Sequence, residues 1–281
     1  MNIIDAIINL VTNPVTKLAE YYQGRNRANN AGDALEEYVK DLFAGTFDTP
    51  AEERLRIHNE VFSYLGNNSN PPDAILKNGD AIEVKKTEAD NAPLALNSSY
   101  PKHKLTANSP MISTACRNAE QWVEKDILYV VGTIAGRTNR LKQLCMVYGT
   151  EYCASGECYE RIRRAIKEGV EAIEGIDFSE SRELGHINKV DPLGITYMRV
   201  RGMWGISNPL KAFDYIYSKD HTKAFNFMCI ISEEKWKTLE RKDELVALSE
   251  SRKGLSISGK QVKDPDNPAK LINVKLITFS V

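Results

Sequence analysis

The sequence predicts an α/β protein in which a mixed β-sheet core is flanked by helices. Short β-branched or wholly apolar runs, typical of buried strands, alternate along the chain with longer segments whose apolar residues recur at helical spacing. The chain has 281 residues, of which 42% are hydrophobic and 27% charged, so it can bury a sizeable core. We therefore expect a single domain over residues 1–281.

Helices are expected wherever apolar side chains return every three or four residues. This spacing is longest in residues 155–176, where Ser155 is a suitable N-cap, and we expect this helix to cover one face of the sheet. Asn13 and Pro14 separate two shorter helices, because the residue before a proline disfavours helical backbone. The predicted helices are residues 3–10, 15–22, 32–43, 155–176 and 233–248.

Strands are expected at short apolar or β-branched runs. Residues 127–131 and 144–148 are apolar or β-branched throughout, which is typical of strands in the middle of a sheet. Residues 254–268 are rich in Gly, Ser, Lys, Asp and Pro, so an exposed loop or hairpin is expected there. Further strands are expected at residues 195–201, 225–231 and 274–279.

One β-hairpin is predicted in detail. Asn78 and Gly79 form the dipeptide that best supplies two positive φ angles, and apolar residues flank it on both sides. The sequence therefore pairs residues 74–77 with residues 81–85 through a type I′ turn.

Composition and charge exclude several classes of protein. The 37 Lys and Arg residues against 38 Asp and Glu give a net charge of -1, so any surface that binds nucleic acid must be local. No apolar run is long enough to span a membrane, and the five cysteines favour reduced thiols and a cytoplasmic location. Residues 132–136 lack the Gly-Lys-Ser/Thr ending of a phosphate-binding loop, so no nucleotide cofactor is expected.

The strongest chemical signal lies on the predicted hairpin. Side chains alternate along a strand, so Glu83 and Lys85 project together, and Asp73 folds back beside Glu83 from the partner strand. Two such carboxylates repel unless a cation lies between them, and Mg²⁺ prefers oxygen ligands together with water and phosphate. A lysine beside the metal can polarise the attacking water. The pattern predicts phosphodiester hydrolysis; the alternative is a surface hairpin with solvated charges.

This arrangement resembles the PD-(D/E)XK nuclease superfamily, whose motif is matched by Asp73, which follows a proline, and by Glu83-Val84-Lys85. The resemblance implies a restriction-endonuclease-like fold with Asp73, Glu83 and Lys85 as catalytic residues. The expected metal-binding positions are Asp73, Glu83 and Val84. A further acidic residue is implied on the preceding helix, and Glu36 is the candidate because it lies at the edge of that helix's apolar face. The alternative for Glu36 is an ordinary exposed glutamate.

Beyond this motif, the N-terminal half of the chain is similar to the NgoPII family of type II restriction endonucleases. The resemblance implies a homodimer that makes Mg²⁺-dependent double-strand breaks in DNA at a short palindrome, with GGCC as the expected site. We accordingly expect a catalytic core at about residues 30–175 and elements for DNA recognition and dimerisation at about residues 176–281. The similarity is carried by residues 83–86, 96–102, 109–112, 122 and 125–132.

Two segments offer side chains suited to DNA contacts. The first follows the catalytic strand, and its alternative is a polar loop that serves solubility. The second is a strand with alternating arginines followed by a tryptophan that packs beneath or stacks on DNA, and its alternative is an edge strand protected against aggregation. The candidates are Asn97, Ser98, Ser99, Lys102 and Lys104 in the first segment and Arg199, Arg201 and Trp204 in the second.

Three other functions stay open on the sequence alone. A structure-specific or repair nuclease would use the same residues and the same metal ion. A non-catalytic DNA-binding protein would keep the hairpin as a scaffold, and an unrelated interaction protein would use neither.

Overall fold

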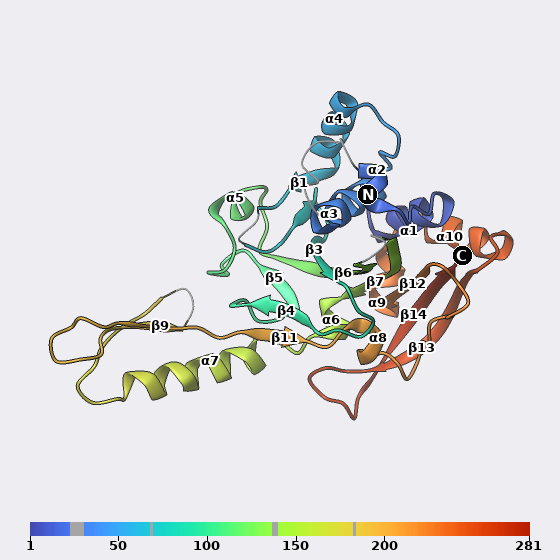
Figure 1. Ribbon diagram of the computed structural model, residues 1–281. Helices are drawn as coiled ribbons and strands as arrows, with labels where there is room; N and C mark the ends of the chain where they lie inside the picture. The colour runs from blue at the N-terminus through green and yellow to red at the C-terminus, as the bar shows by residue number, and fades with distance from the viewer. Residues whose placement is uncertain (23–30, 68–69, 137–139, 182–183) are drawn as a thin grey trace.

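A computed structural model describes residues 1–22, 31–67, 70–136, 140–181 and 184–281, and Figure 1 shows a large sheet with helices packed against it. Within these residues the sheet has nine strands and mixes parallel with antiparallel pairs, which confirms the predicted fold class. Across the sheet the order is β1 (Phe62–Tyr64), β2 (Ala74–Leu76), β3 (Ala81–Thr87), β6 (Glu124–Ala135), β7 (Arg140–Tyr148), β12 (Asn226–Ser232), β14 (Leu271–Ser280) and β13 (Leu255–Lys263), with β5 (Lys104–Thr106) paired to β6.

The middle of the sheet consists of β3, β6, β7 and β12. β3 runs parallel to β6, and β7 runs parallel to β12, whereas β6 and β7 are antiparallel. Both faces of β6 and β7 are buried, which explains why these strands are almost continuously apolar. The pairing of β3 with β6 places Glu83 directly beside Tyr129.

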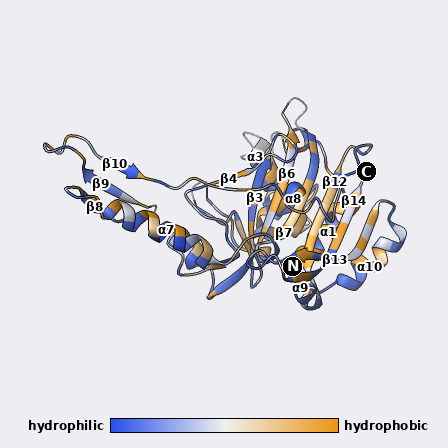
Figure 2. Cartoon of the chain, turned by 90° about the horizontal axis from the view of Figure 1, so that it is seen from below, coloured by the Kyte–Doolittle hydropathy of each residue, from blue (hydrophilic) through white to orange (hydrophobic). Residues whose placement is uncertain are grey.

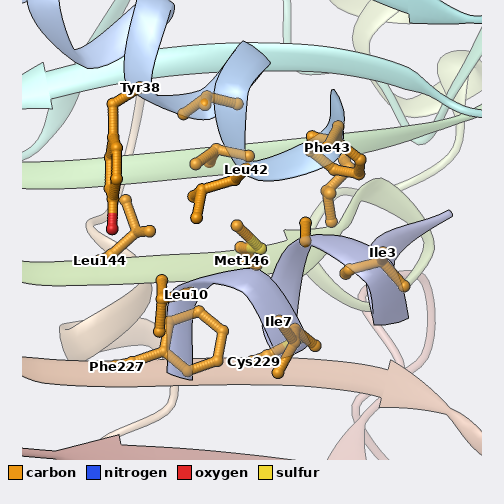
Figure 3. Packing of buried hydrophobic residues seen from close by; sticks show 14 of the residues in the cluster. Ile3, Ile7, Leu10, Tyr38, Leu42, Phe43, Leu144, Met146, Phe227 and Cys229 are labelled. Atoms are coloured by element: carbon orange, nitrogen blue, oxygen red, sulfur yellow. The ribbon is translucent and has the colours of Figure 1, made fainter. Parts of the chain in front are cut away.

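Helices cover both faces of this sheet. Figure 3 shows apolar side chains of α1 and α3 packed against Leu144 and Met146 of β7 and Phe227 of β12. This layer contains α1 (Ile3–Thr12), α2 (Leu18–Tyr22), α3 (Ala31–Ala44), α9 (Glu233–Thr238) and α10 (Lys242–Ser251), and α4 (Ala51–Val61) contacts α3. The opposite face is covered by the short helices α5 (Thr114–Arg117), α6 (Gly149–Tyr152) and α8 (Pro209–Ala212). None of the helices in the described ranges is both long enough and apolar enough to cross a membrane.

An arm projects from this body. It consists of α7 (Gly156–Glu171) and a separate antiparallel sheet, and Figures 1 and 2 both show it extending away from the central sheet. No residue of α7, all of which is described, is buried, so the prediction that this helix covers the central sheet is wrong. Helical spacing reveals an apolar stripe but not its partner. The strands of the arm are β8 (Asp177–Ser179), β9 (Gly185–Lys189) and β10 (Met198–Val200).

The base of the arm joins the body next to the β2–β3 hairpin. After β10 the chain forms β11 (Trp204–Ile206), which pairs with β4 (Leu94–Asn97). Two aromatic residues close to this pairing, Tyr100 and Tyr159, stack with ring centroids 5.3 Å apart. The arm is therefore linked to the segment that follows β3.

The predicted β2–β3 hairpin is confirmed, but its turn differs from the prediction. Asn78 has a φ of 54°, whereas Gly79 has no positive φ, so the turn is not type I′. Its closing bond runs from the Gly79 N–H to the Leu76 carbonyl at 2.9 Å. A Cβ at Gly79 would lie 3.0 Å from the Leu76 Cβ, so glycine avoids a tight contact here and is not required by its φ angle.

Three further predicted elements are altered. The helix expected at residues 233–248 is two helices, because the chain turns at Arg241, whose φ is 60°. The strand expected at residues 195–201 is confined to β10. Residues 254–268 contain β13 and the start of its connection to β14, so the hairpin alternative for this segment is confirmed.

Candidate active site

The β2–β3 hairpin brings Asp73 and Glu83 together. The Asp73 N–H donates to the Ile82 carbonyl at 2.9 Å, and the Val84 N–H donates to Asp73 Oδ2 at 2.6 Å. The Asp73 carboxylate therefore folds back onto β3. The side chains of Ile82 and Val84 belong to the core beneath the α1–α3 layer, so Glu83 and Lys85 project to the other face, as the alternation predicts.

Glu83 and Lys85 form a short ion pair. Lys85 Nζ lies 2.5 Å from Glu83 Oε1, and Glu83 is only 8% exposed. Its other oxygen, Oε2, is buried and has no hydrogen-bond partner within the described part of the chain. A buried acceptor without a donor is costly, so this oxygen marks a position where a ligand is expected.

Burial and mutual repulsion disfavour the charged form of both carboxylates. Burial, followed by the charge of Asp73, raises the pKa of Glu83 to about 7. Burial also raises the pKa of Asp73, although the Lys85 ammonium opposes this shift. Burial would lower the pKa of Lys85, but the Glu83 and Asp73 carboxylates raise it overall, so the ammonium stays charged. The cluster therefore favours an additional cation between its carboxylates.

Glu36 reaches the same site from α3. Burial, followed by the charge of Asp73, raises the pKa of Glu36 to about 7. The charge of Lys40, one turn further along α3, opposes this shift. Glu36 therefore acts as a third acidic group near the hairpin and not as an exposed helix glutamate.

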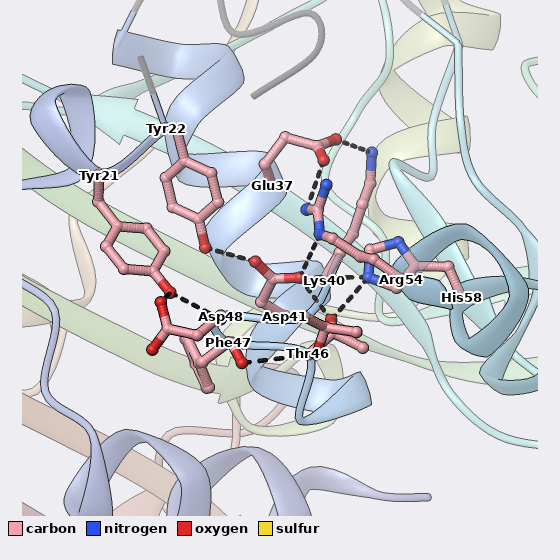
Figure 4. Close-up of polar contacts among 11 residues, drawn as sticks. Tyr21, Tyr22, Glu37, Lys40, Asp41, Thr46, Phe47, Asp48, Arg54 and His58 are labelled. Atoms are coloured by element: carbon pink, nitrogen blue, oxygen red, sulfur yellow. Dashed lines mark hydrogen bonds and ion pairs between the residues drawn. The ribbon is translucent and has the colours of Figure 1, made fainter. Parts of the chain in front are cut away.

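The orientation of α3 is set by a buried polar network, shown in Figure 4. Arg54 of α4 donates to Asp41 Oδ1 and to Glu37 Oε2, both at 2.7 Å. Tyr22 donates to the other oxygen of Asp41 at 2.7 Å. Because Glu37 and Asp41 occupy one side of α3, these bonds fix the rotation that turns Glu36 toward Asp73.

Glu36, Asp73, Glu83 and Lys85 line one cavity of about 510 Å³. Arg201 Nη2 donates to Ser98 Oγ at 3.2 Å, so the two segments predicted to contact DNA meet at its edge. The predicted residues that line this cavity are Glu36, Asp73, Glu83, Val84, Lys85, Asn97, Ser98, Ser99, Lys102 and Arg201.

Three of the predicted DNA-binding residues lie outside this lining. Lys104, on β5, pairs with Glu124 at 2.8 Å and faces a different hollow of the surface. Arg199 is on β10 of the arm, where it is paired in register with His186. Trp204 packs edge-on against Tyr100 and Tyr159 at the base of the arm.

Several residues in or next to the cavity were not among the predicted site residues. Gly66 has a φ of 77°, and a Cβ there would lie 2.3 Å from the Asp73 carbonyl oxygen. Tyr100 and Tyr129 line the cavity; both lie in segments that carry the family resemblance, but the sequence did not assign either of them to the site. Only the tertiary contacts of these three residues distinguish them.

The donor set fits a Mg²⁺ ion that takes few protein ligands. No group of three or more His, Cys, Asp or Glu side chains close enough to hold a metal ion occurs in residues 1–22, 31–67, 70–136, 140–181 and 184–281. Asp73 and Glu83 supply two carboxylates, and the unpartnered Glu83 Oε2 is available to a cation. Mg²⁺ commonly binds one or two carboxylates and completes its shell with water and phosphate oxygens.

Comparisons with known proteins agree with this chemistry. The model of the NgoPII restriction endonuclease family matches residues 1–263. The chain is also similar to the type II restriction enzyme NgoPII of Neisseria gonorrhoeae, with 57% identity over 279 residues and coverage of 99% of both chains. No solved structure matches the chain.

Proposed function

The chain belongs to the NgoPII restriction endonuclease family, and from this premise we propose how its active site cuts DNA. It is a type II restriction endonuclease, a site-specific deoxyribonuclease. This assignment is favoured over the repair nuclease, the non-catalytic binder and the interaction protein that the sequence left open. The observation that carries the proposed site is the convergence of Asp73, Glu83 and Lys85 in one cavity.

Asp73, Glu83 and Lys85 are the catalytic residues in this proposal. Asp73, Glu83 and the main-chain carbonyl of Val84 would hold Mg²⁺, which when bound supplies Lewis-acid stabilisation of phosphate charge. Lys85, held by Glu83 Oε1, orients the water that attacks phosphorus. The water gives up a proton to solvent as its oxygen bonds to phosphorus, one phosphorus–oxygen ester bond breaks, and the leaving oxygen takes up a proton from solvent. Glu36 binds a further water beside this centre.

The proposed contacts to DNA extend from this centre along the cavity edge. Ser98 and Ser99 offer hydroxyl groups to phosphates, and Asn97 and Arg201 offer groups that can also reach base edges. We propose that the recognised sequence is a short palindrome and that GGCC is the first sequence to test. Phosphate contacts weaken binding to all sequences when lost, whereas loss of a base contact weakens specific binding more.

We propose that the enzyme is a homodimer joined through the arm. Two active sites are needed to cut both strands of a palindrome. The connection between β9 and β10 carries Leu193, Ile195 and Tyr197, which are 81%, 75% and 71% exposed, and apolar clusters of this kind mark interaction surfaces. Sedimentation of the wild type should give the mass of two chains, and replacement of Leu193 and Ile195 by lysine should give one. A dimer unchanged by both replacements would place the interface elsewhere.

A cytoplasmic location completes the proposal. All five cysteines are free thiols in the structure. Free thiols of this kind are typical of a reducing compartment, where the enzyme would also meet its DNA.

A plasmid digest tests the proposed function. With Mg²⁺ the wild type should give discrete fragments whose ends map to one sequence, and Asp73→Ala and Lys85→Ala should give none while still binding DNA. A smear would indicate a nuclease without sequence preference. Full cutting by both variants would refute the assigned site.

A further inference from the structure

Lys102 differs from the other buried lysine of the described chain. Lys102 and Lys125 are 6% and 8% exposed. Lys125 Nζ donates to the Gly79 carbonyl at 2.7 Å and pairs with Glu120, so its charge is satisfied inside the protein. Lys102 Nζ is buried without a hydrogen-bond acceptor among the described residues. Burial of an ammonium without an acceptor is unfavourable, so the missing acceptor is expected to come from a ligand.

The main chain of Lys102 is fixed to the catalytic sheet. The Tyr129 hydroxyl accepts a hydrogen bond from the Lys102 N–H at 2.7 Å and donates to the Lys102 carbonyl at 3.3 Å. Tyr129 lies on β6 directly beside Glu83. Gly149 packs so closely that a Cβ there would lie 2.3 Å from the Lys102 carbonyl oxygen. Lys102 is therefore positioned relative to Glu83 by the central sheet and not by a free loop.

The side chain of Lys102 lies against an aromatic face. Its Nζ is 3.3 Å from the centroid of the Tyr100 ring, which gives a cation–π contact. This ring is itself held by the stacked Tyr159 and the edge-on Trp204. An aromatic face attracts the charge but leaves the N–H donors of the ammonium without a hydrogen-bonding oxygen. Burial, followed by the nearby Arg163, lowers the pKa of Lys102 to about 8, although the charges of Glu160 and Glu83 oppose this shift.

We propose that Lys102 is a second catalytic cation of this enzyme and that its ammonium binds a non-bridging oxygen of the scissile phosphate. The proposal rests on the proposed phosphodiester hydrolysis. Lys102 lines the same cavity as Glu83 and Lys85, and the substrate of this cavity is a polyanion whose phosphate oxygens are strong acceptors. Because a fixed ammonium interacts best with the charge distribution of the transition state, Lys102 should contribute more to the cleavage rate than to DNA affinity.

The test compares Lys102→Met with Lys125→Met. Single-turnover cleavage is measured on a duplex that the wild type cuts, and the dissociation constant of the same duplex is measured without divalent cations. Lys102→Met should lower the cleavage rate about 100-fold or more while it weakens binding much less. It should unfold no earlier than the wild type, because it removes an unsatisfied buried charge. Lys125→Met should unfold earlier and cleave at the wild-type rate per folded molecule.

A modified duplex locates the contact. Once the cleavage position is mapped, a methylphosphonate replaces the scissile phosphate and removes its negative charge. This replacement should weaken binding of the wild type more than binding of Lys102→Met. Should Lys102→Met not fold, Lys102→Gln serves in the same measurements.

Three results would overturn the role of Lys102. They are an unchanged cleavage rate in the variant, an equal fall in cleavage rate and DNA affinity, and equal weakening of both proteins by the methylphosphonate. A wild type that cuts no DNA at all would refute the proposed function instead, so the two failures are distinguishable.

Discussion

Two buried carboxylate clusters of this protein are built in opposite ways. Both oxygens of Asp41 accept hydrogen bonds within the network of Figure 4. In the cavity, Glu83 Oε1 pairs with Lys85, but Oε2 has no partner among the described residues. The donors to Asp41 are Tyr22, Thr46, Arg54 and His58.

The pKa values follow this difference. Burial raises the pKa of Asp41, but the hydrogen bonds from His58 and Arg54 outweigh it and hold the pKa below its ordinary value. Burial and the charge of Asp73 raise the pKa of Glu83 to about 7. A fully bonded buried carboxylate stabilises the fold, whereas burial of an incompletely bonded one opposes folding.

The largest expected effect on activity is that of Glu83→Gln. Cleavage should fall by about 100-fold to 1000-fold or more, because the variant loses a carboxylate that we propose binds the metal ion. Thermal unfolding without divalent cations should occur at the wild-type temperature or above it, because a repelling buried charge is removed. A clear drop in the unfolding temperature would show that Glu83 supports the fold in the way that Asp41 does.

The largest expected effect on stability is that of Asp41→Asn. The free energy of unfolding should fall by about 3–5 kcal/mol, because Arg54 would lose its buried partner. Glu60→Gln is the control, since Glu60 pairs with Arg56 on the exposed surface of α4 and should contribute at most about 1 kcal/mol. Urea denaturation measures both variants. Similar losses of unfolding free energy in Asp41→Asn and Glu60→Gln would mean that the buried ion pair of Asp41 stabilises the fold no more than an exposed one.

Comparing Gly66→Ala with Gly175→Ala should show whether displacement of Asp73 affects cleavage beyond the effect of backbone strain on stability. Gly66 and Gly175 have φ angles of 77° and 81°, but only a Cβ at Gly66 would meet another residue, the Asp73 backbone at 2.3 Å. Both alanine variants should lose about 1–3 kcal/mol of stability from the positive φ. Only Gly66→Ala should also slow single-turnover cleavage. Equal cleavage rates for the two variants would show that the position of Asp73 tolerates movement.

The smallest expected effects are pH dependences of opposite sign. The pKa of Asp41 lies below its ordinary value of 3.8, so the ionised carboxylate contributes its full stabilisation above pH 3.8. This stabilisation is lost as the pH falls below 3.8 and through the lowered pKa. The pKa of Glu83 is raised from 4.5 to about 7, so its protonated form is the one that favours folding. This contribution is fully present below pH 4.5 and is lost as the pH rises toward 7. Unfolding free energies of the wild type, Asp41→Asn and Glu83→Gln in metal-free buffer give both slopes. If Asp41 and Glu83 changed the unfolding free energy with pH in the same direction, the proposed difference between the two carboxylate clusters would be wrong.

The fold was predictable wherever the pattern was local. The apolar runs of β6 and β7 and the spacing in α1 and α3 indicate the sheet and its helical layer, because period and burial are linked within each element. The position of α7 in the arm was not predictable, since an apolar stripe does not name its partner. The break at Arg241 was also missed, because the left-handed conformation of that residue has no sequence signature.

The sequence by itself determined the chemistry of the site. Asp73, Glu83 and Lys85 are placed by strand alternation and by a hairpin between them, and both are local properties of about a dozen residues. Tertiary structure alone decided what surrounds them: the unpartnered Oε2 of Glu83, the approach of Glu36 from α3 and the burial of Lys102. Burial and missing hydrogen-bond partners depend on segments far apart in the chain, so they exist only after the sheet, the helices and the base of the arm have come together.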